Sequence, residues 1–173
     1  MFRIRDQESK QLSKVQTKKR HQLAILEKQL DLAAKYKRAV SMHCVQSTGP
    51  IIQLLSRRID EHEPLPPRIC LHSFGGSVDT IKGLTKRKKK SSVDIYFSFS
   101  IVINGRYNRL SDLIRAVPED RLLIETDYHS PFELDNYMAM IIKLVSEVRG
   151  WTEELTVKKT HENFMKFIGK SNS

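Results

Sequence analysis

The stretch RICLHSFGGSVDTIKGLTK, residues 68–86, contains one complete strand–turn–helix unit. Its first residues, Arg68–His72, form a short and mainly apolar run that predicts a buried strand. Phe74-Gly75-Gly76-Ser77 predicts a turn, which leads into a helix from Val78 to about Lys86. The chain therefore contains a β-strand that is followed directly by an α-helix.

The same order of elements continues on both sides of this unit. On the amino-terminal side we predict a helix over 18–37, a strand over 39–44 and a helix from about 48 to 60. On the carboxy-terminal side we predict strands over 94–100 and 121–127, a turn over 103–105, and helices over 108–117, 134–149 and 152–168. Residues 1–17 show no clear period, and we interpret them as a lead-in to a domain that spans residues 18–173.

The spacing of the strands predicts an α/β fold. Successive strands begin about 27 residues apart and alternate with helices, a pattern that implies parallel pairing through right-handed crossovers. Two architectures fit this order of elements. One is an open, doubly wound sheet, and the other is part of a TIM-type (β/α)8 barrel, which needs about 250 residues.

Composition and charge limit the possible partners and compartments. The 173 residues suit one domain, and the formal net charge of +10 favours a polyanionic partner. Basic clusters at 18–20 and 86–90 are either solvated ends of elements or sites of phosphate contact or nuclear targeting. No apolar run suggests a membrane span, Met1–Lys10 lacks the apolar stretch of a signal peptide, and Cys44 and Cys70 read as reduced thiols. We therefore predict a cytoplasmic or nuclear protein that does not span a membrane.

Three polar residues stand at the ends of predicted strands. His43 ends the first strand, His72 the second and Asp127 the fourth. Ligands bind at the carboxyl ends of parallel strands because the connecting loops open there. Two imidazoles and a carboxylate at one edge suit a divalent metal ion such as zinc, manganese or magnesium. The alternative is that each residue is a hydrogen-bonded structural side chain.

The last of these strands places two carboxylates on one face. In RLLIETD, residues 121–127, side chains alternate between faces. If Leu122 and Ile124 meet the helices, Glu125 and Asp127 face inward, where a buried carboxylate needs a cation or a hydrogen-bond donor. The alternative is an ordinary strand with a solvated acidic end.

Several short motifs together resemble those of the TatD-type metal-dependent deoxyribonucleases. Residues 122–127 with Pro131 resemble the E-T-D segment of that family, and Met42-His43-Cys44 resembles its histidine-bearing fifth strand. The segment 71–76 resembles H-x-F-x-G on the sixth strand, residues 160–164 resemble the closing T-x-x-N-F, and residues 29–33 resemble the helix before the fifth strand. The resemblance extends over nearly the whole chain from about residue 18.

This resemblance implies a fold and an activity. The fold would be the carboxy-terminal half of a TIM-type barrel, strands five to eight, and the activity would be hydrolysis of DNA phosphodiester bonds. By analogy, His43, His72 and Asp127 would be ligands of divalent metal ions (Mg, Mn or Zn), and Asp127 would also act in catalysis. Glu125 would support its neighbour. Arg106 could contact a phosphate, although an ordinary surface arginine is the alternative.

Two motifs of such a nuclease are absent from the sequence. The chain has no H-x-H pair and no G-E-x-G-L-D segment. We therefore expect that Met1 corresponds to an internal methionine of a longer protein, and that this chain alone is a weakly active or inactive nuclease. Its open half-barrel could pair with a second copy or with the missing half. Two further readings remain open, which are a metal hydrolase acting on another small ester or amide and a non-catalytic protein that binds nucleic acid or a protein partner.

Overall fold

The computed structural model describes residues 3–5, 12–44, 47–86 and 93–170, and the side chains within those ranges from residue 17 onward. The elements, in chain order, are β1 (Arg3–Arg5), β2 (Leu12–Gln16), α1 (Lys19–Lys35), β3 (Val40–His43), α2 (Thr48–Asp60), β4 (Arg68–His72), α3 (Val78–Lys86), β5 (Asp94–Phe99), α4 (Ile101–Asn104), α5 (Leu110–Ala116), η2 (Glu119–Arg121), β6 (Leu122–Ile124), η3 (Pro131–Glu133), α6 (Leu134–Arg149) and α7 (Glu153–Ile168). Most of the basic cluster at 86–90 lies outside the described residues.

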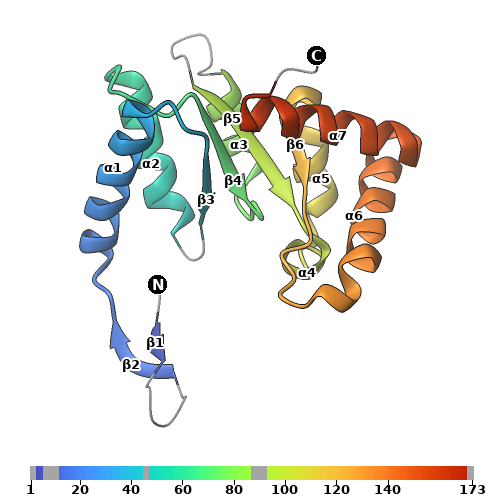
Figure 1. Ribbon diagram of the computed structural model, residues 1–173, viewed down its shortest axis with the longest axis horizontal. Coiled ribbons are helices and arrows are strands. Elements are labelled where there is room, and N and C mark those ends of the chain that lie inside the picture. The colour runs from blue at the N-terminus through green and yellow to red at the C-terminus, as the bar shows by residue number, and fades with distance from the viewer. Residues whose placement is uncertain (1–2, 6–11, 45–46, 87–92, 171–173) are drawn as a thin grey trace.

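The parallel sheet predicted from the spacing is confirmed. Its strands pair in the order β3-β4-β5-β6, and every pair is parallel (Figure 1). The register sets His43 of β3 opposite His72 of β4. Parallel strands end at the same edge of a sheet, so the loops that follow β3 and β4 open side by side.

The two faces of the sheet bury different sets of side chains. One face carries the main core, in which strand residues such as Leu71, Phe97 and Leu122 pack with apolar residues from the helices. The other face carries a smaller cluster built on Cys70, Tyr96, Leu123 and Phe167. The predicted alternation of β6 is therefore confirmed, because Leu122 and Leu123 belong to different clusters.

Helix α7 lies across the end of the sheet where the strands begin. In Figure 1 it crosses beside β5 and β6, and the arrowheads of β4 and β5 point away from it. Asn163 of α7 donates to the carbonyl oxygens of Glu119 and Leu122 at 2.7 and 3.0 Å, and Arg68 donates to the carbonyl of Phe167 at 2.8 Å. The motif at 160–164 that resembles the closing segment of TatD-type nucleases thus fastens α7 to the sheet.

The structure differs from the predicted elements in three places. The lead-in contains an antiparallel pair, β1 with β2, which the absence of a clear period did not predict. Ile103 and Asn104 of the predicted turn belong to the helical turn α4, in which the Ser100 hydroxyl accepts from the Ile103 N–H. Strand β6 is shorter than predicted because η2 precedes it and Asp127 has a left-handed backbone, with φ of 49°. Across the described ranges, no helix is both long and apolar enough to cross a bilayer.

Candidate metal centre at the carboxyl edge of the sheet

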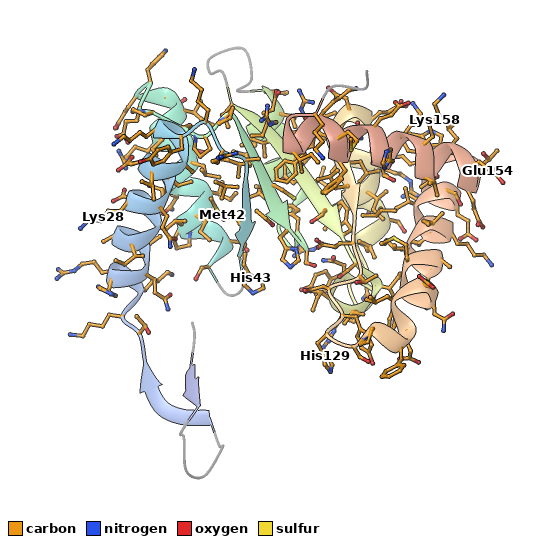
Figure 2. All side chains as sticks on the ribbon, viewed as in Figure 1. Lys28, Met42, His43, His129, Glu154 and Lys158 are labelled. Atoms are coloured by element: carbon orange, nitrogen blue, oxygen red, sulfur yellow. The ribbon has the colours of Figure 1, made fainter. Side chains whose placement is uncertain are left out.

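His72 lies between two carboxylates at the carboxyl edge of the sheet. Its Nδ1 is 2.6 Å from Oε2 of Glu125, and its Nε2 is 3.3 Å from Oδ1 of Asp127. The ring of His43 lies beside it, with the two ring centroids 5.6 Å apart. In Figure 2, His43 lies at the end of β3 that is farther from α7. The fold therefore brings together residues of β3, of β4 and of the segment that follows β6, which are far apart in the sequence.

Glu125 is the most firmly held of these side chains. Its Oε1 accepts hydrogen bonds from the backbone N–H of Ser73 at 2.8 Å and from the Ser73 hydroxyl at 2.6 Å. Burial by itself would raise the pKa of Glu125, but the hydrogen bonds from His72 and Ser73 outweigh it and hold the pKa below its ordinary value. Glu125 is therefore an ionised carboxylate at neutral pH, and it requires a donor from His72.

Both neighbouring carboxylates affect the pKa of His72. The hydrogen bond to Glu125 raises the pKa of His72, burial opposes this shift, and the charges of Glu125 and Asp127 add to it. The His72 side chain is 22% exposed and that of Asp127 is 29% exposed, so solvent and small ions can reach the Nε2 side of the ring. A positive charge is favoured between Nε2 and Asp127, and either a proton or a metal ion would supply it.

Two residues of the site have left-handed backbone conformations. Ser73 has φ of 43° and Asp127 has φ of 49°, and neither is glycine. Such conformations cost of the order of 1 kcal/mol or more and persist where the surroundings hold them in place. Buried Asn104 supplies part of that support, because its side-chain N–H group donates to the carbonyl oxygens of Ser73 and Phe74 at 3.3 and 3.2 Å.

The predicted site residues fall into two groups. His43, His72, Glu125 and Asp127 lie together at the carboxyl edge. Arg106 is an exposed residue that follows α4, and among the described residues no hydrogen bond or ion pair joins it to this group. Its role in phosphate binding stays a prediction.

The serine and asparagine residues beneath the site were not predicted from the sequence. Ser73, Ser98, Ser100 and Asn104 form a polar network, in which Ser100 N–H donates to Asn104 Oδ1 at 2.9 Å and the hydroxyls of Ser73 and Ser100 are 3.2 Å apart. A usable signal was present in Ser98-Phe99-Ser100, where period-2 alternation places two hydroxyls on the face that carries Tyr96. These residues act on the site through Glu125.

The donor set fits a metal ion only in part. Within the portion of the chain that the structure describes, no group of three or more His, Cys, Asp and Glu side chains is arranged to hold an ion. The cysteines do not contribute, since burial raises the pKa of Cys44 to about 11 and that of Cys70 to about 12. The edge therefore presents His72 Nε2 and the Asp127 carboxylate as a pair, with His43 beside them.

Comparison with known proteins identifies the family that the chain matches. The model of the TatD related DNase family matches residues 10–169. The chain is 33% identical to the Cut9-interacting protein scn1 of Schizosaccharomyces pombe, over 91% of this chain and 53% of that protein. It is 30% identical to an uncharacterized deoxyribonuclease of Saccharomyces cerevisiae, over 93% of this chain and 54% of that protein. The chain thus spans about half the length of both relatives.

Solved structures decide between the two predicted architectures. A hydrolase of the TatD family from Entamoeba histolytica superimposes with a TM-score of 0.67 at 16% identity, covering 90% of this chain and 59% of that one. An uncharacterized amidohydrolase from Saccharomyces cerevisiae gives a TM-score of 0.66 at 16% identity, covering 86% of this chain and 60% of that one. The prediction of a partial TatD-type barrel is confirmed, and the open doubly wound sheet is excluded.

Proposed function

The chain belongs to the TatD-related DNase family, and from this membership we propose that it forms the carboxy-terminal part of a metal-dependent hydrolase of DNA phosphodiester bonds. The observation that carries the proposal is the position of His72, whose Nδ1 meets Glu125 while its Nε2 faces Asp127 at the carboxyl edge. In parallel barrels this edge is where substrates bind and react. A histidine that donates one ring N–H to a carboxylate and presents the other nitrogen is a common arrangement in metal sites.

The residues present define what each could do. His72, Asp127 and His43 would hold a divalent ion (Mg, Mn or Zn), which lowers the pKa of bound water and neutralises charge on a phosphate. Asp127 is also placed to accept the proton of an attacking water molecule, because its carboxylate lies at the solvent-reached side of the ring. With two or three ligands, this chain alone should bind metal weakly and hydrolyse DNA slowly or not at all.

A metal-binding assay tests this assignment. We expect isothermal titration with Zn²⁺ or Mn²⁺ to show binding by the wild-type chain that Asp127→Asn weakens about tenfold or more, as loss of a charged ligand does. The matched control is Asp112→Asn, an exposed carboxylate on α5 that pairs with Arg115. Equal affinity of the wild type and Asp127→Asn would contradict the assignment.

A nuclease assay on end-labelled oligonucleotides tests the activity. We expect little or no metal-dependent cleavage by this chain. Cleavage that needs Mg²⁺ and disappears in Asp127→Asn would show that the chain is a complete nuclease, contrary to the proposal. Activity on small phosphoesters or amides in place of DNA would favour another metal hydrolase of the same fold.

A second candidate function is the binding of a polypeptide at the open edge of the sheet. Among the described strands, β3 pairs only with β4. Next to it lies a groove of about 540 Å³ between α1, β3 and the start of α2, and His43 is part of its lining. The apolar residues of the lining are Leu23, Leu26, Leu30, Val40, Met42 and Ile51. A parallel strand that is paired on one side and has an apolar groove on the other is suited to receive a further strand.

We propose that its occupant is a parallel strand from the part of the TatD-type fold that lies outside the matched half. In a strand–helix–strand unit a parallel strand lies beside β3, but β2, the strand that precedes α1 in this chain, pairs with β1 instead. The solved relatives contain a further two-fifths of chain that this one does not match. Such a strand would end next to His43 and could add ligands to the edge. The relative in Schizosaccharomyces pombe is named for an interaction with Cut9. The more general form of this proposal is therefore that the groove binds a segment of a protein partner.

Mixing experiments test the groove. We expect this chain to form a complex with the unmatched portion of the Saccharomyces cerevisiae deoxyribonuclease, and expect Leu26→Asp in the groove to abolish it. Leu155→Asp on α7 is the control, because Leu155 is exposed and lies outside the groove. A wild-type complex that survives Leu26→Asp, or a stable homodimer by sedimentation in place of a complex, would contradict the proposed occupant.

A further inference from the structure

We propose that Ser73 and Glu125 are positioning residues that fix the tautomer of His72, with its proton on Nδ1 and the lone pair of Nε2 presented to a cation. The cation rests on the function proposed above. The tautomer is a property of this chain and can be measured without any metal.

Ser73 determines which oxygen of Glu125 is left for the ring. Its backbone N–H can only donate, and it is directed at Oε1 at 2.8 Å. Its hydroxyl donates to the same oxygen at 2.6 Å. Oε2 is therefore the atom that meets His72 Nδ1, at 2.6 Å. An ionised carboxylate only accepts hydrogen bonds, so Nδ1 must carry a proton.

Ser73 has a left-handed backbone conformation while its N–H donates to Glu125, and the network below holds that conformation. The residue has φ of 43°. Asn104, which is fully buried, binds its carbonyl oxygen at 3.3 Å, and the Ser98 hydroxyl accepts from the same backbone N–H at 3.2 Å. Both supports come from β5 and the turn that follows it. The orientation of the ring on β4 is thus set by residues of β5, of α4 and of the segment that follows β6.

The other ring nitrogen, Nε2, is then free of a proton and can bind a cation. With Nδ1 protonated, the neutral ring directs the lone pair of Nε2 toward the side where Asp127 Oδ1 lies 3.3 Å away. A lone pair and a carboxylate at that distance repel each other unless a positive charge stands between them. The pair is therefore suited to share one cation, and a histidine of the opposite tautomer would point an N–H at that cation and block it.

Glu125→Gln is the substitution that separates this inference from a merely structural role. The side chain keeps its shape, but the Gln oxygen must face Ser73, because a backbone N–H cannot accept a hydrogen bond. The Gln NH2 group then faces Nδ1, which must accept, and the proton of the neutral ring moves to Nε2. Replacing a residue that only stabilised the fold would not move the proton from one ring nitrogen to the other.

The tautomer can be read from the ¹⁵N shifts of the His72 ring in long-range ¹H–¹⁵N spectra of the metal-free chain at alkaline pH. We expect Nδ1–H in the wild type, Nε2–H in Glu125→Gln, and the wild-type pattern in Glu153→Gln, an exposed carboxylate at the start of α7. Zn²⁺ affinity should fall by about 10- to 100-fold in Glu125→Gln. In Ser73→Ala it should fall by about three- to tenfold, since the backbone N–H remains.

Each outcome bears on the inference in a defined way. An Nε2–H tautomer in the wild type overturns it, and this measurement needs no variant to fold. An unchanged Nδ1–H tautomer in Glu125→Gln also overturns it. If both tautomers are as expected but Zn²⁺ does not bind the wild type, the positioning role stands and the proposed metal centre fails.

Discussion

Asn163→Ala tests how α7 is fastened to the amino-terminal end of the sheet. The side chain is 3% exposed and donates to the carbonyl oxygens of Glu119 and Leu122. Leaving a buried acceptor without its donor costs about 1–3 kcal/mol. Glu119 is exposed, so water can replace that bond, whereas Leu122 is fully buried. The penalty should therefore come mainly from one carbonyl, and we expect a loss of about 2 kcal/mol in the free energy of unfolding.

Urea unfolding followed by circular dichroism at the helical band measures this loss. In a domain of this size, about 2 kcal/mol corresponds to a decrease of roughly 4–8 °C in Tm. Asn136→Ala is the matched control, because Asn136 is exposed on α6 and its replacement should change stability by less than about 0.5 kcal/mol. If Asn163→Ala unfolds at the same urea concentration as the control, then α7 is held by its apolar contacts. In that case our interpretation that the 160–164 motif attaches α7 to the sheet is wrong.

Three further predictions concern other parts of the fold. Arg58→Ala should lower the free energy of unfolding by roughly 1–3 kcal/mol in urea titrations, because the Arg58 side chain is 6% exposed and bound to two carboxylates; neighbouring Arg57 is 41% exposed, and its replacement should cost less than about 1 kcal/mol. Cys44 and Cys70 should resist alkylation at pH 8 in the native chain and react in urea, since burial raises the pKa of both thiols, and mass spectrometry would detect a contrary result. Gly83→Ala should raise the melting temperature, with a gain of about 0.5–1 kcal/mol, because Gly83 lies within α3 and an added methyl group meets nothing within 4 Å; a loss of stability would mean that the helix needs the glycine.

The sequence predicted the regular elements well where periodicity and turn residues agreed. The strand Arg68–His72 and the helices Val78–Lys86 and Leu134–Arg149 have the predicted bounds. The hairpin in the lead-in and the short helix α4 were not predicted. Their extents are three, five and four residues, too short for a periodic pattern to emerge, so they depend on pairing and capping that the sequence does not display.

The candidate site shows the same division. Strand alternation and the rule on strand ends were enough to select His43, His72, Glu125 and Asp127, and the structure brings them to one edge. Arg106 was selected from its position after a turn, and position alone could not say whether its side chain would reach the others. The role of Ser73 was invisible, because nothing in a single serine indicates a left-handed backbone whose N–H meets a carboxylate 52 positions away.

The sequence by itself determined the α/β class, the parallel order of the strands and the residue types at the strand ends, because these follow from local periodicity and from the geometry of one strand. Only the tertiary structure decided that Glu125 binds one nitrogen of His72 while Asp127 faces the other. It also decided that β3, among the described strands, pairs only with β4 and lies beside an apolar groove. Distances between side chains on different strands depend on register, twist and backbone conformation at the strand ends, and these are fixed by packing across the whole sheet.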